Sequence, residues 1–277
     1  MGRRAYCLIG DPVAHSLSPL LHGTAFALLG ADAVYEKIRV APESLEDFVA
    51  EGAFDGYNIT IPHKERVIPL LDELAGDALA AGAVNTAVRD GGKTVGYNTD
   101  MEGLLLALRG QGRGYAGSVV CVLGTGGAAR GCAKKAALEG ARDVRIVGRS
   151  REKAEGILPG AYAGPLSEEA VRGADIFVNA TPLGMAGYAE DFADTAFLGG
   201  LPAHALVYDC VYTPRETTLV RAARARGLSA ESGLSMLVWQ GLLSEALWGV
   251  AGRDALLGGE LYQEVFGVLD EKLRIEN

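Results

Sequence analysis

The chain has 277 residues, which is enough for two domains or one large one. Its composition is globular, with 49% hydrophobic and 22% charged residues, and its net charge of −9 argues against a nucleic-acid-binding surface. No apolar run approaches the roughly 18 residues of a membrane span, and the four cysteines lack paired metal-ligand spacing, so we expect a cytoplasmic protein without a metal site.

The N-terminal part alternates between strands and helices. The elements that we expect there are a strand over 5–9, a helix over 19–29, a strand over 34–40, a helix over 42–52 and a strand over 57–61. Asp11 and Pro12 end the first apolar run too early for a secretory signal peptide. The alternation predicts an α/β fold.

Two serines precede the first helix. Ser18 stands directly before Pro19, as an N-cap residue does before a proline in the first helical position. Capping explains Ser18 but leaves Ser16 unexplained. Two hydroxyls two residues apart at a helix N-terminus would also bind a carboxylate, so both interpretations stay open for this pair.

Polar side chains line one face of the predicted strand 57–61. Asn58 and Thr60 alternate with Ile59 and Ile61, which predicts one polar and one apolar face. Lys64 lies just past this strand, after a proline. A solvated lysine after a turn is the alternative to a functional one.

Less regular segments follow. Residues 67–82 predict a helix broken near Pro69, and residues 83–98 predict a hairpin that turns at 90–92. Asp100 then stands at the start of a helix rich in leucine. On local grounds Asp100 could simply cap this helix.

The segment after the glycine-rich break at 111–117 predicts a nucleotide-binding unit. An apolar strand over 119–123 leads into a turn that fits G-x-G-x-x-A, and a helix over 131–140 and a strand over 144–147 follow. In this pattern Gly124 permits the tight turn and Gly126 lets a pyrophosphate approach the backbone. Free N–H groups at the helix N-terminus would bind the phosphates. The alternative is a tight turn that binds nothing.

The end of the second strand of this unit indicates which dinucleotide binds. An NAD site places an acid there for the ribose 2′-hydroxyl, but this chain has Arg149 and Arg151 and no acid. Arginine pairs with phosphate, so the sequence favours the 2′-phosphate of NADP. A solvated strand end is the alternative for either arginine.

The rest of the chain continues the alternation. The elements that we expect are a helix over 168–173, strands over 176–178 and 205–211, a helix over 216–226, a strand over 229–231, a helix from 233 and a last helix over 255–273.

Taken together, the motifs resemble those of the shikimate dehydrogenase family over nearly the whole chain. The segments that carry the resemblance are 16–19, 58–64, 83–86, 96–100, the glycine turn, 179–185 and 233–240. It implies an enzyme that reduces 3-dehydroshikimate to shikimate with NADPH in aromatic amino-acid biosynthesis. It also implies a small-molecule substrate, no nucleic-acid or membrane partner, and a monomer or homodimer.

The resemblance implies roles for individual residues. Lys64 and Asp100 match the catalytic pair. The substrate contacts that it implies are Ser16, Ser18, Thr60, Asn85, Asp100, Tyr212 and Gln240. The NADP contacts that it implies are Gly124, Gly126, Gly127, Ala128, Arg149, Ser150, Lys153, Thr181 and Gly233.

The resemblance further implies two α/β domains. Residues 1–101 would form an open substrate-binding sheet to which the helices of 236–277 return, and 102–235 would form a Rossmann NADP-binding domain. Two positions depart from the family pattern: Gly148 stands where asparagine is common, and Ser235 stands where glycine is usual.

Two rival functions stay open. A quinate or broad-specificity quinate/shikimate dehydrogenase would bind a similar carboxylate and similar ring hydroxyls. A non-catalytic NADP-binding regulator would not need both Lys64 and Asp100.

Overall fold

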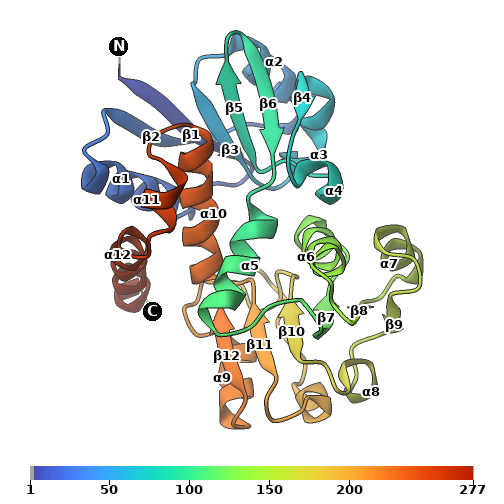
Figure 1. The fold of residues 1–277 in the computed structure, drawn as a ribbon. Coiled ribbons are helices and arrows are strands. Elements are labelled where there is room, and N and C mark those ends of the chain that lie inside the picture. The colour runs from blue at the N-terminus through green and yellow to red at the C-terminus, as the bar shows by residue number, and fades with distance from the viewer. Residues whose placement is uncertain (1–2, 277) are drawn as a thin grey trace. The chain divides into compact units, whose positions relative to one another are not determined.

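The computed structural model describes residues 3–276, which form two compact units (Figure 1). The first contains the chain up to Gly103 together with Leu237–Glu271, and the second contains Leu104–Met236 and the residues from Lys272 on. The units divide at 103/104 and 236/237, and the boundaries expected from the sequence are 101/102 and 235/236. Among the described residues, no helix is long and apolar enough to cross a membrane.

The first unit is built on a mixed sheet of six strands in the order β2-β1-β3-β5-β6-β4. The β1 strand pairs in parallel with β2 and β3, whereas β5 pairs antiparallel with β3 and β6. The bounds are β1 Arg4–Gly10, β2 Ala33–Arg39, β3 Gly56–Ile59, β4 Glu73–Leu74, β5 Thr86–Asp90 and β6 Lys93–Tyr97.

Helices cover this sheet, and the orange α10 lies beside the blue and green strands (Figure 1). The helices are α1 Ser18–Leu29, α2 Leu45–Glu51, α3 His63–Arg66, α4 Ala78–Ala81, α10 Leu234–Leu247, α11 Arg253–Leu257 and α12 Glu260–Glu276, together with the start of α5 Asp100–Gly110. Two 3₁₀ turns occur at Pro42–Ser44 and Ile68–Leu70. Leu45 of α2 is buried, and Phe48 and Val49 pack against the same apolar cluster.

Two helix predictions were wrong in this unit. The segment 67–82 is not one broken helix but a 3₁₀ turn, the two-residue strand β4 and the short α4. Pro69 lacks a backbone donor and Gly76 adopts a φ of 56°, so neither continues a helix. The predicted last helix is divided into α11 and α12, because Gly259 has a φ of 88°.

The second unit is a parallel sheet in the order β12-β11-β10-β7-β8-β9. Counted from β7, this is the strand order of a Rossmann fold, as predicted. The strands are β7 Val119–Leu123, β8 Asp143–Val147, β9 Tyr162–Gly164, β10 Ile176–Asn179, β11 Leu206–Asp209 and β12 Ser229–Ser232. The helices between them are α6 Gly127–Leu138, α7 Arg151–Ile157, α8 Glu168–Val171 and α9 Thr218–Ala225, with a 3₁₀ turn at Ala196–Gly200.

The central strands of this sheet are buried on both faces, and Cys121, Phe177 and Val207 belong to one core cluster. Continuous apolar runs are typical of such strands, and runs of this kind predicted β7, β10 and β11, whereas the run that predicted β8 is interrupted by Arg145. Strand β9 has no such apolar run, because its three residues are only half-buried.

Candidate active site

Lys64 and Asp100 lie together in the first unit. The short α3 presents Lys64 just past β3, and Asp100 occupies the first turn of α5. Lys64 Nζ donates to Asp100 Oδ2 at 2.6 Å, and the two side chains are 27% and 18% exposed. The pair is therefore shielded but still accessible to a small molecule.

Asp100 is not the cap of its helix. The Asn98 side chain accepts a hydrogen bond from Met101 N at 3.2 Å, so it takes the capping role. The two oxygens of Asp100 accept instead from Lys64 and, at 2.9 Å, from Asn85 Nδ2. The local interpretation of Asp100 as a helix cap is thus wrong.

The amide of Asn85 has a single orientation. Its oxygen accepts from Thr99 N at 2.7 Å, which turns its nitrogen toward Asp100. The same nitrogen lies 3.3 Å from Gln240 Oε1, on α10. A helix far along the sequence thus brings Gln240 to the residues expected to contact the substrate.

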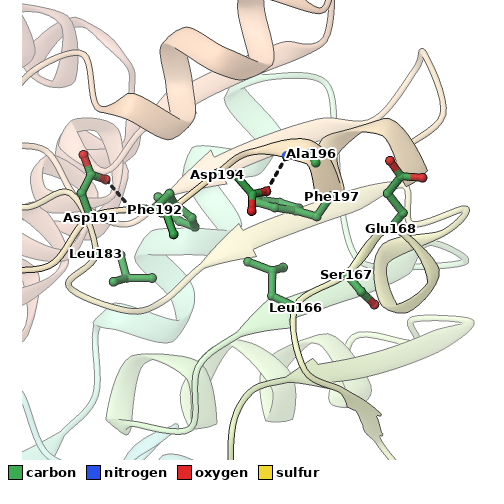
Figure 2. A pocket seen from close by; sticks show the side chains of 10 residues that line it. Leu166, Ser167, Glu168, Leu183, Asp191, Phe192, Asp194, Ala196 and Phe197 are labelled. Atoms are coloured by element: carbon green, nitrogen blue, oxygen red, sulfur yellow. Dashed lines mark hydrogen bonds between the residues drawn. The ribbon is translucent and has the colours of Figure 1, made fainter.

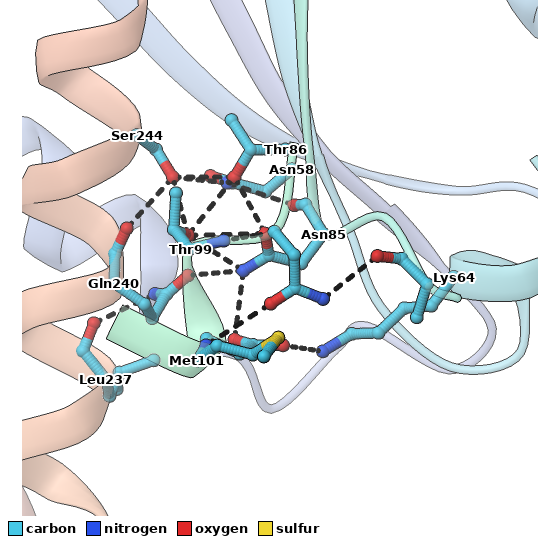
Figure 3. A network of polar contacts seen from close by, with 12 residues as sticks. Asn58, Lys64, Asn85, Thr86, Thr99, Met101, Leu237, Gln240 and Ser244 are labelled. Carbon is cyan, nitrogen blue, oxygen red and sulfur yellow. Dashed lines mark hydrogen bonds and ion pairs between the residues drawn. The ribbon is translucent and has the colours of Figure 1, made fainter. Parts of the chain in front are cut away.

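A cluster of hydroxyls supports these side chains, and the sequence analysis missed it (Figure 3). Thr86, Thr99 and Ser244 are buried, and Thr86 Oγ1 lies 2.8 Å from Ser244 Oγ and 3.3 Å from Thr99 Oγ1. Asn58 donates to Ser244 Oγ at 3.0 Å. Ser244 stands four residues after Gln240, on the same helix face, and this spacing was the available signal.

The two serines form a pair at the start of α1. Ser16 Oγ donates to Ser18 Oγ at 3.1 Å and accepts from Ser18 N at 3.2 Å. Ser18 is the first residue of the helix, and Leu17 is the N-cap, without a side-chain capping bond. The prediction of Ser18 as N-cap is therefore wrong. Thr60, which was also predicted to contact the substrate, follows β3 and is half-buried.

The glycine turn of the second unit fits a dinucleotide. Gly124 has a φ of 117°, and a Cβ there would lie 2.9 Å from Thr181 Cγ2, so this turn requires glycine. A Cβ at Gly126 or Gly127 would meet open space. Helix α6 begins at Gly127, earlier than predicted, and no side chain caps it. The first N–H groups of α6 therefore have no side-chain acceptor at the N-cap, and Ala128 in its first turn is exposed.

The residues that follow β8 are those predicted to bind the 2′-phosphate of NADP. Arg149 is exposed, and the residues directly after the strand, 148–151, include no acid. Ser150 caps α7 by accepting from Lys153 N at 3.3 Å, so the hydroxyl and the lysine lie on one helical turn. A Cβ at Gly148 would lie 3.5 Å from Thr125, an ordinary contact distance, so the backbone does not require glycine there.

A buried polar pair organises the carboxyl ends of β10 and β11. Asn179 Nδ2 donates to Asp209 Oδ1 at 2.8 Å, and Asn179 Oδ1 accepts from Thr181 Oγ1 at 2.6 Å. Burial raises the pKa of Asp209 to about 6, although bonds from Thr217 and Val211 oppose this shift. Thr181 was predicted as a cofactor contact, whereas no role was predicted for Asn179, which opens the same motif, or for Asp209; these two residues hold the loop of Thr181.

Gly233 and Ser235 lie where β12 meets α10. A Cβ at Gly233 would lie 2.1 Å from Cys210 O, so only glycine fits. Ser235 is buried and its Oγ lies 2.9 Å from the Tyr208 hydroxyl, which explains how this departure from the family pattern is accommodated. Tyr212 follows β11, and burial raises its pKa.

A pocket of about 290 Å³ lies elsewhere in the second unit (Figure 2). Apolar side chains such as Leu183 and Phe197 line it, with Glu168, Asp191 and Asp194 among them. Asp191 and Asp194 accept from backbone N–H groups of their own loop. The pocket contains none of the predicted site residues, and its acidic lining does not suit a phosphate. Among the described residues no group of His, Cys, Asp and Glu could hold a metal ion.

Two family models match separate parts of the chain. Residues 8–87 match the shikimate dehydrogenase substrate binding domain. Residues 119–196 match a family described as NADP oxidoreductase, coenzyme F420-dependent. The first match covers Lys64 and Asn85, and the second covers the glycine turn.

Similar proteins and structures extend over most of the chain. A shikimate dehydrogenase (NADP(+)) from Rubrobacter xylanophilus is 45% identical, covering 87% of this chain and 89% of its own. One from Symbiobacterium thermophilum is 43% identical, covering 87% of each chain. A solved shikimate 5-dehydrogenase from Thermus thermophilus, in complex with NADP(H) and shikimate, superimposes with a TM-score of 0.85 at 33% identity, covering 97% of this chain and 99% of that one. The chain therefore belongs to the shikimate dehydrogenase family.

Proposed function

We propose that this protein is an NADP-dependent shikimate dehydrogenase, which reversibly reduces 3-dehydroshikimate to shikimate in aromatic amino-acid biosynthesis. The observation that carries the proposal is the contact of 2.6 Å between Lys64 Nζ and Asp100 Oδ2, within a chain of this family. A binding protein without chemistry would have no need of a shielded lysine–carboxylate pair.

The pair supplies acid–base chemistry. NADPH, when bound, supplies the hydride. Reduction of the substrate ketone places negative charge on its oxygen, and Lys64 Nζ is the group that stabilises this charge and donates the proton. In the oxidation direction Lys64 accepts the proton of the hydroxyl. Asp100 holds the flexible lysine in place, and Asn85 holds Asp100 through its second oxygen.

The remaining polar groups orient the substrate. We assign the Ser16 and Ser18 hydroxyls to its carboxylate, because they lie 3.1 Å apart and neither side chain caps α1. Thr60, Asn85 and Gln240 are assigned to the ring hydroxyls. Tyr212 is assigned as a further substrate contact, on the family resemblance.

The second unit binds NADP in this proposal. The open space at Gly126 and Gly127 and the N-terminus of α6 take the pyrophosphate. Arg149, with Ser150 and Lys153 on the next helical turn, takes the 2′-phosphate, where an NAD site would have an acid. Thr181 and Gly233 complete the assigned contacts.

The experiment that tests this function is turnover of shikimate with NADP, followed by the absorbance of NADPH. Activity with this pair and much lower activity with quinate or with NAD is the expected result. Absence of turnover, with NADP binding retained, would favour a non-catalytic regulator instead. Preference for quinate would favour the quinate dehydrogenase.

Location and assembly belong to the same proposal. We assign the protein to the cytoplasm, where the substrate and NADPH are available, and expect a monomer or a homodimer. Light scattering of the purified protein distinguishes the two states.

A further inference from the structure

The Tyr35 side chain joins two parts of the polar cluster in the first unit. Its hydroxyl donates a hydrogen bond of 2.7 Å to Asn58 Oδ1. The Ser18 side chain lies near the same hydroxyl, and Ser16 Oγ in turn donates to Ser18 Oγ at 3.1 Å. Tyr35 thus lies between the two serines and the amide of Asn58.

Beyond Asn58, the hydrogen bonds lead to the reaction centre. Asn58 Nδ2 donates to Thr86 Oγ1 at 3.1 Å, and Thr86 Oγ1 donates to Asn85 Oδ1 at 3.1 Å. Asn85 Nδ2 then donates to Asp100 Oδ1 at 2.9 Å, and the other oxygen of Asp100 accepts from Lys64. Asn58, Thr86 and Asn85 each accept from one neighbour and donate to the next, so their orientations are coupled, and Asp100 accepts from both of its neighbours.

The Tyr35 proton and the Asn85 backbone carbonyl, which accepts from Asn58 Nδ2 at 3.3 Å, together set the orientation of the first amide in this series. An asparagine side chain has an acceptor oxygen and a donor nitrogen on opposite arms. A donor at Oδ1 therefore turns Nδ2 of Asn58 toward Thr86 and Ser244. Burial raises the pKa of Tyr35 well above its ordinary value of 10, so the hydroxyl stays a donor at neutral pH.

The ring of Tyr35 is held by other contacts than the hydroxyl. It stacks on His22, with 4.1 Å between ring centroids and 21° between ring planes. His22 Nδ1 lies 2.8 Å from Glu245 Oε1, and both side chains are fully buried. A phenylalanine at this position would keep the stack and lose only the hydrogen bonds.

On the basis of the proposed function, we infer that Tyr35 is a positioning residue for the dehydrogenase reaction. Its hydroxyl supports one orientation of the Asn58 amide. Through Thr86 this orientation adds a further hydrogen bond to Asn85 Oδ1, beside the one from Thr99 N, and so helps Asn85 to hold Asp100 against Lys64. Tyr35 contacts none of the reacting groups itself, so its effect is on the rate of the bound complex and not on the cofactor.

The test is the Tyr35→Phe variant, assayed for shikimate oxidation with NADP. The kcat should fall about tenfold, which corresponds to about 1.4 kcal/mol and is the size of one buried hydrogen bond. The KM for NADP should not change. Tyr57→Phe is the matched control, because Tyr57 precedes Asn58 on β3 and its buried hydroxyl has no partner among the described residues. This control should keep its kcat.

A double variant tests the path through Asn58. If Tyr35 acts through this amide, Tyr35→Phe combined with Asn58→Ala should be no slower than Asn58→Ala alone. Unchanged kcat in Tyr35→Phe, an equal loss in Tyr57→Phe, or a multiplicative loss in the double variant would overturn the inference. So would a Tyr35→Phe protein too unstable to assay, since the hydroxyl would then be structural. Failure of the parent protein to oxidise shikimate is a separate result, which refutes the proposed function itself.

Discussion

Replacing Lys64 with alanine tests the proposed chemistry most directly. The structure gives Lys64 Nζ one strong contact, with Asp100 Oδ2 at 2.6 Å, and leaves a quarter of the side chain exposed for a substrate. Loss of one acid–base group typically lowers the rate by about 10²–10⁴. We therefore expect kcat for shikimate oxidation to fall by this factor, with a much smaller change in NADP binding.

Stability should change far less than activity. Both side chains of the pair are partly exposed, and exposed pairs contribute roughly 0.2–1 kcal/mol. Asp100 also keeps its hydrogen bond from Asn85 when Lys64 is removed. The melting temperature measured beside kcat should therefore show a folded protein. Lys93→Ala, an exposed lysine of the same unit, is the matched control and should behave as the parent.

Two results would refute the role of Lys64. One is a Lys64→Ala variant that keeps more than about a tenth of the parent kcat, because the proton would then come from another group or from water. The other is strict additivity with Asp100→Asn. Two groups that act as a unit give a double variant hardly slower than the worse single variant.

Four further predictions concern other residues of the two units. Arg149→Ala should raise the KM for NADP about ten- to a hundredfold, the effect of roughly 1.5–3 kcal/mol for one charge-assisted bond, and equal changes for NADP and NAD would contradict the assignment. Ser18→Ala should weaken shikimate binding in a titration. Its stability should not fall by the about 1 kcal/mol that removal of a helix cap costs, because Ser18 makes no capping bond. Unchanged shikimate affinity would show that the serine does not bind the carboxylate. Gly126→Ala should keep the melting temperature of the parent, because the added Cβ meets open space. It should lose NADP affinity, because in the proposed complex the Cβ occupies the place of the pyrophosphate. Normal NADP affinity would exclude this location of the pyrophosphate. Burial raises the pKa of Asp209 from 3.8 to about 6, so the folded protein binds more protons than the unfolded chain, and the free energy of unfolding should decrease as the pH rises from about 4 to 6. The Asp209→Asn variant should lack this pH dependence in denaturant titrations. An unchanged dependence would show that another group causes it.

The fold was predictable where a local pattern is sufficient to define an element. Strands β7 and β10 are continuous apolar runs because helices cover both faces of the sheet, and such runs are visible in the sequence. The prediction for the segment 67–82 failed because its apolar residues are shared among three short elements, each too short to show a period. The tertiary contacts of these elements, which no local window contains, decide their form.

The site was predictable only where its residues belong to recognised motifs. Lys64, Asn85, Asp100 and Gln240 were named in this way, and the structure brings them into one network (Figure 3). Ser244 was missed because a serine in an apolar helix has no local reason to be functional. Its partner Thr86 lies 158 positions away, and only the fold makes the two hydroxyls neighbours.

The register of α10 against β5 connects these findings. Gln240 and Ser244 of α10, and Trp248 directly after its last residue, stand at intervals of four and contact three successive residues that lead into and along β5. Asn85 Nδ2 lies 3.3 Å from Gln240 Oε1, Thr86 Oγ1 lies 2.8 Å from Ser244 Oγ, and Trp248 Nε1 donates to Ala87 O at 3.0 Å. A shift of the helix by one residue would break all three bonds and leave buried donors unpaired, at a cost of about 1–3 kcal/mol each. The register of the whole helix therefore places Gln240 beside Asn85. The polar residues behind the site contact no substrate in the proposed mechanism, but they determine where its catalytic groups lie.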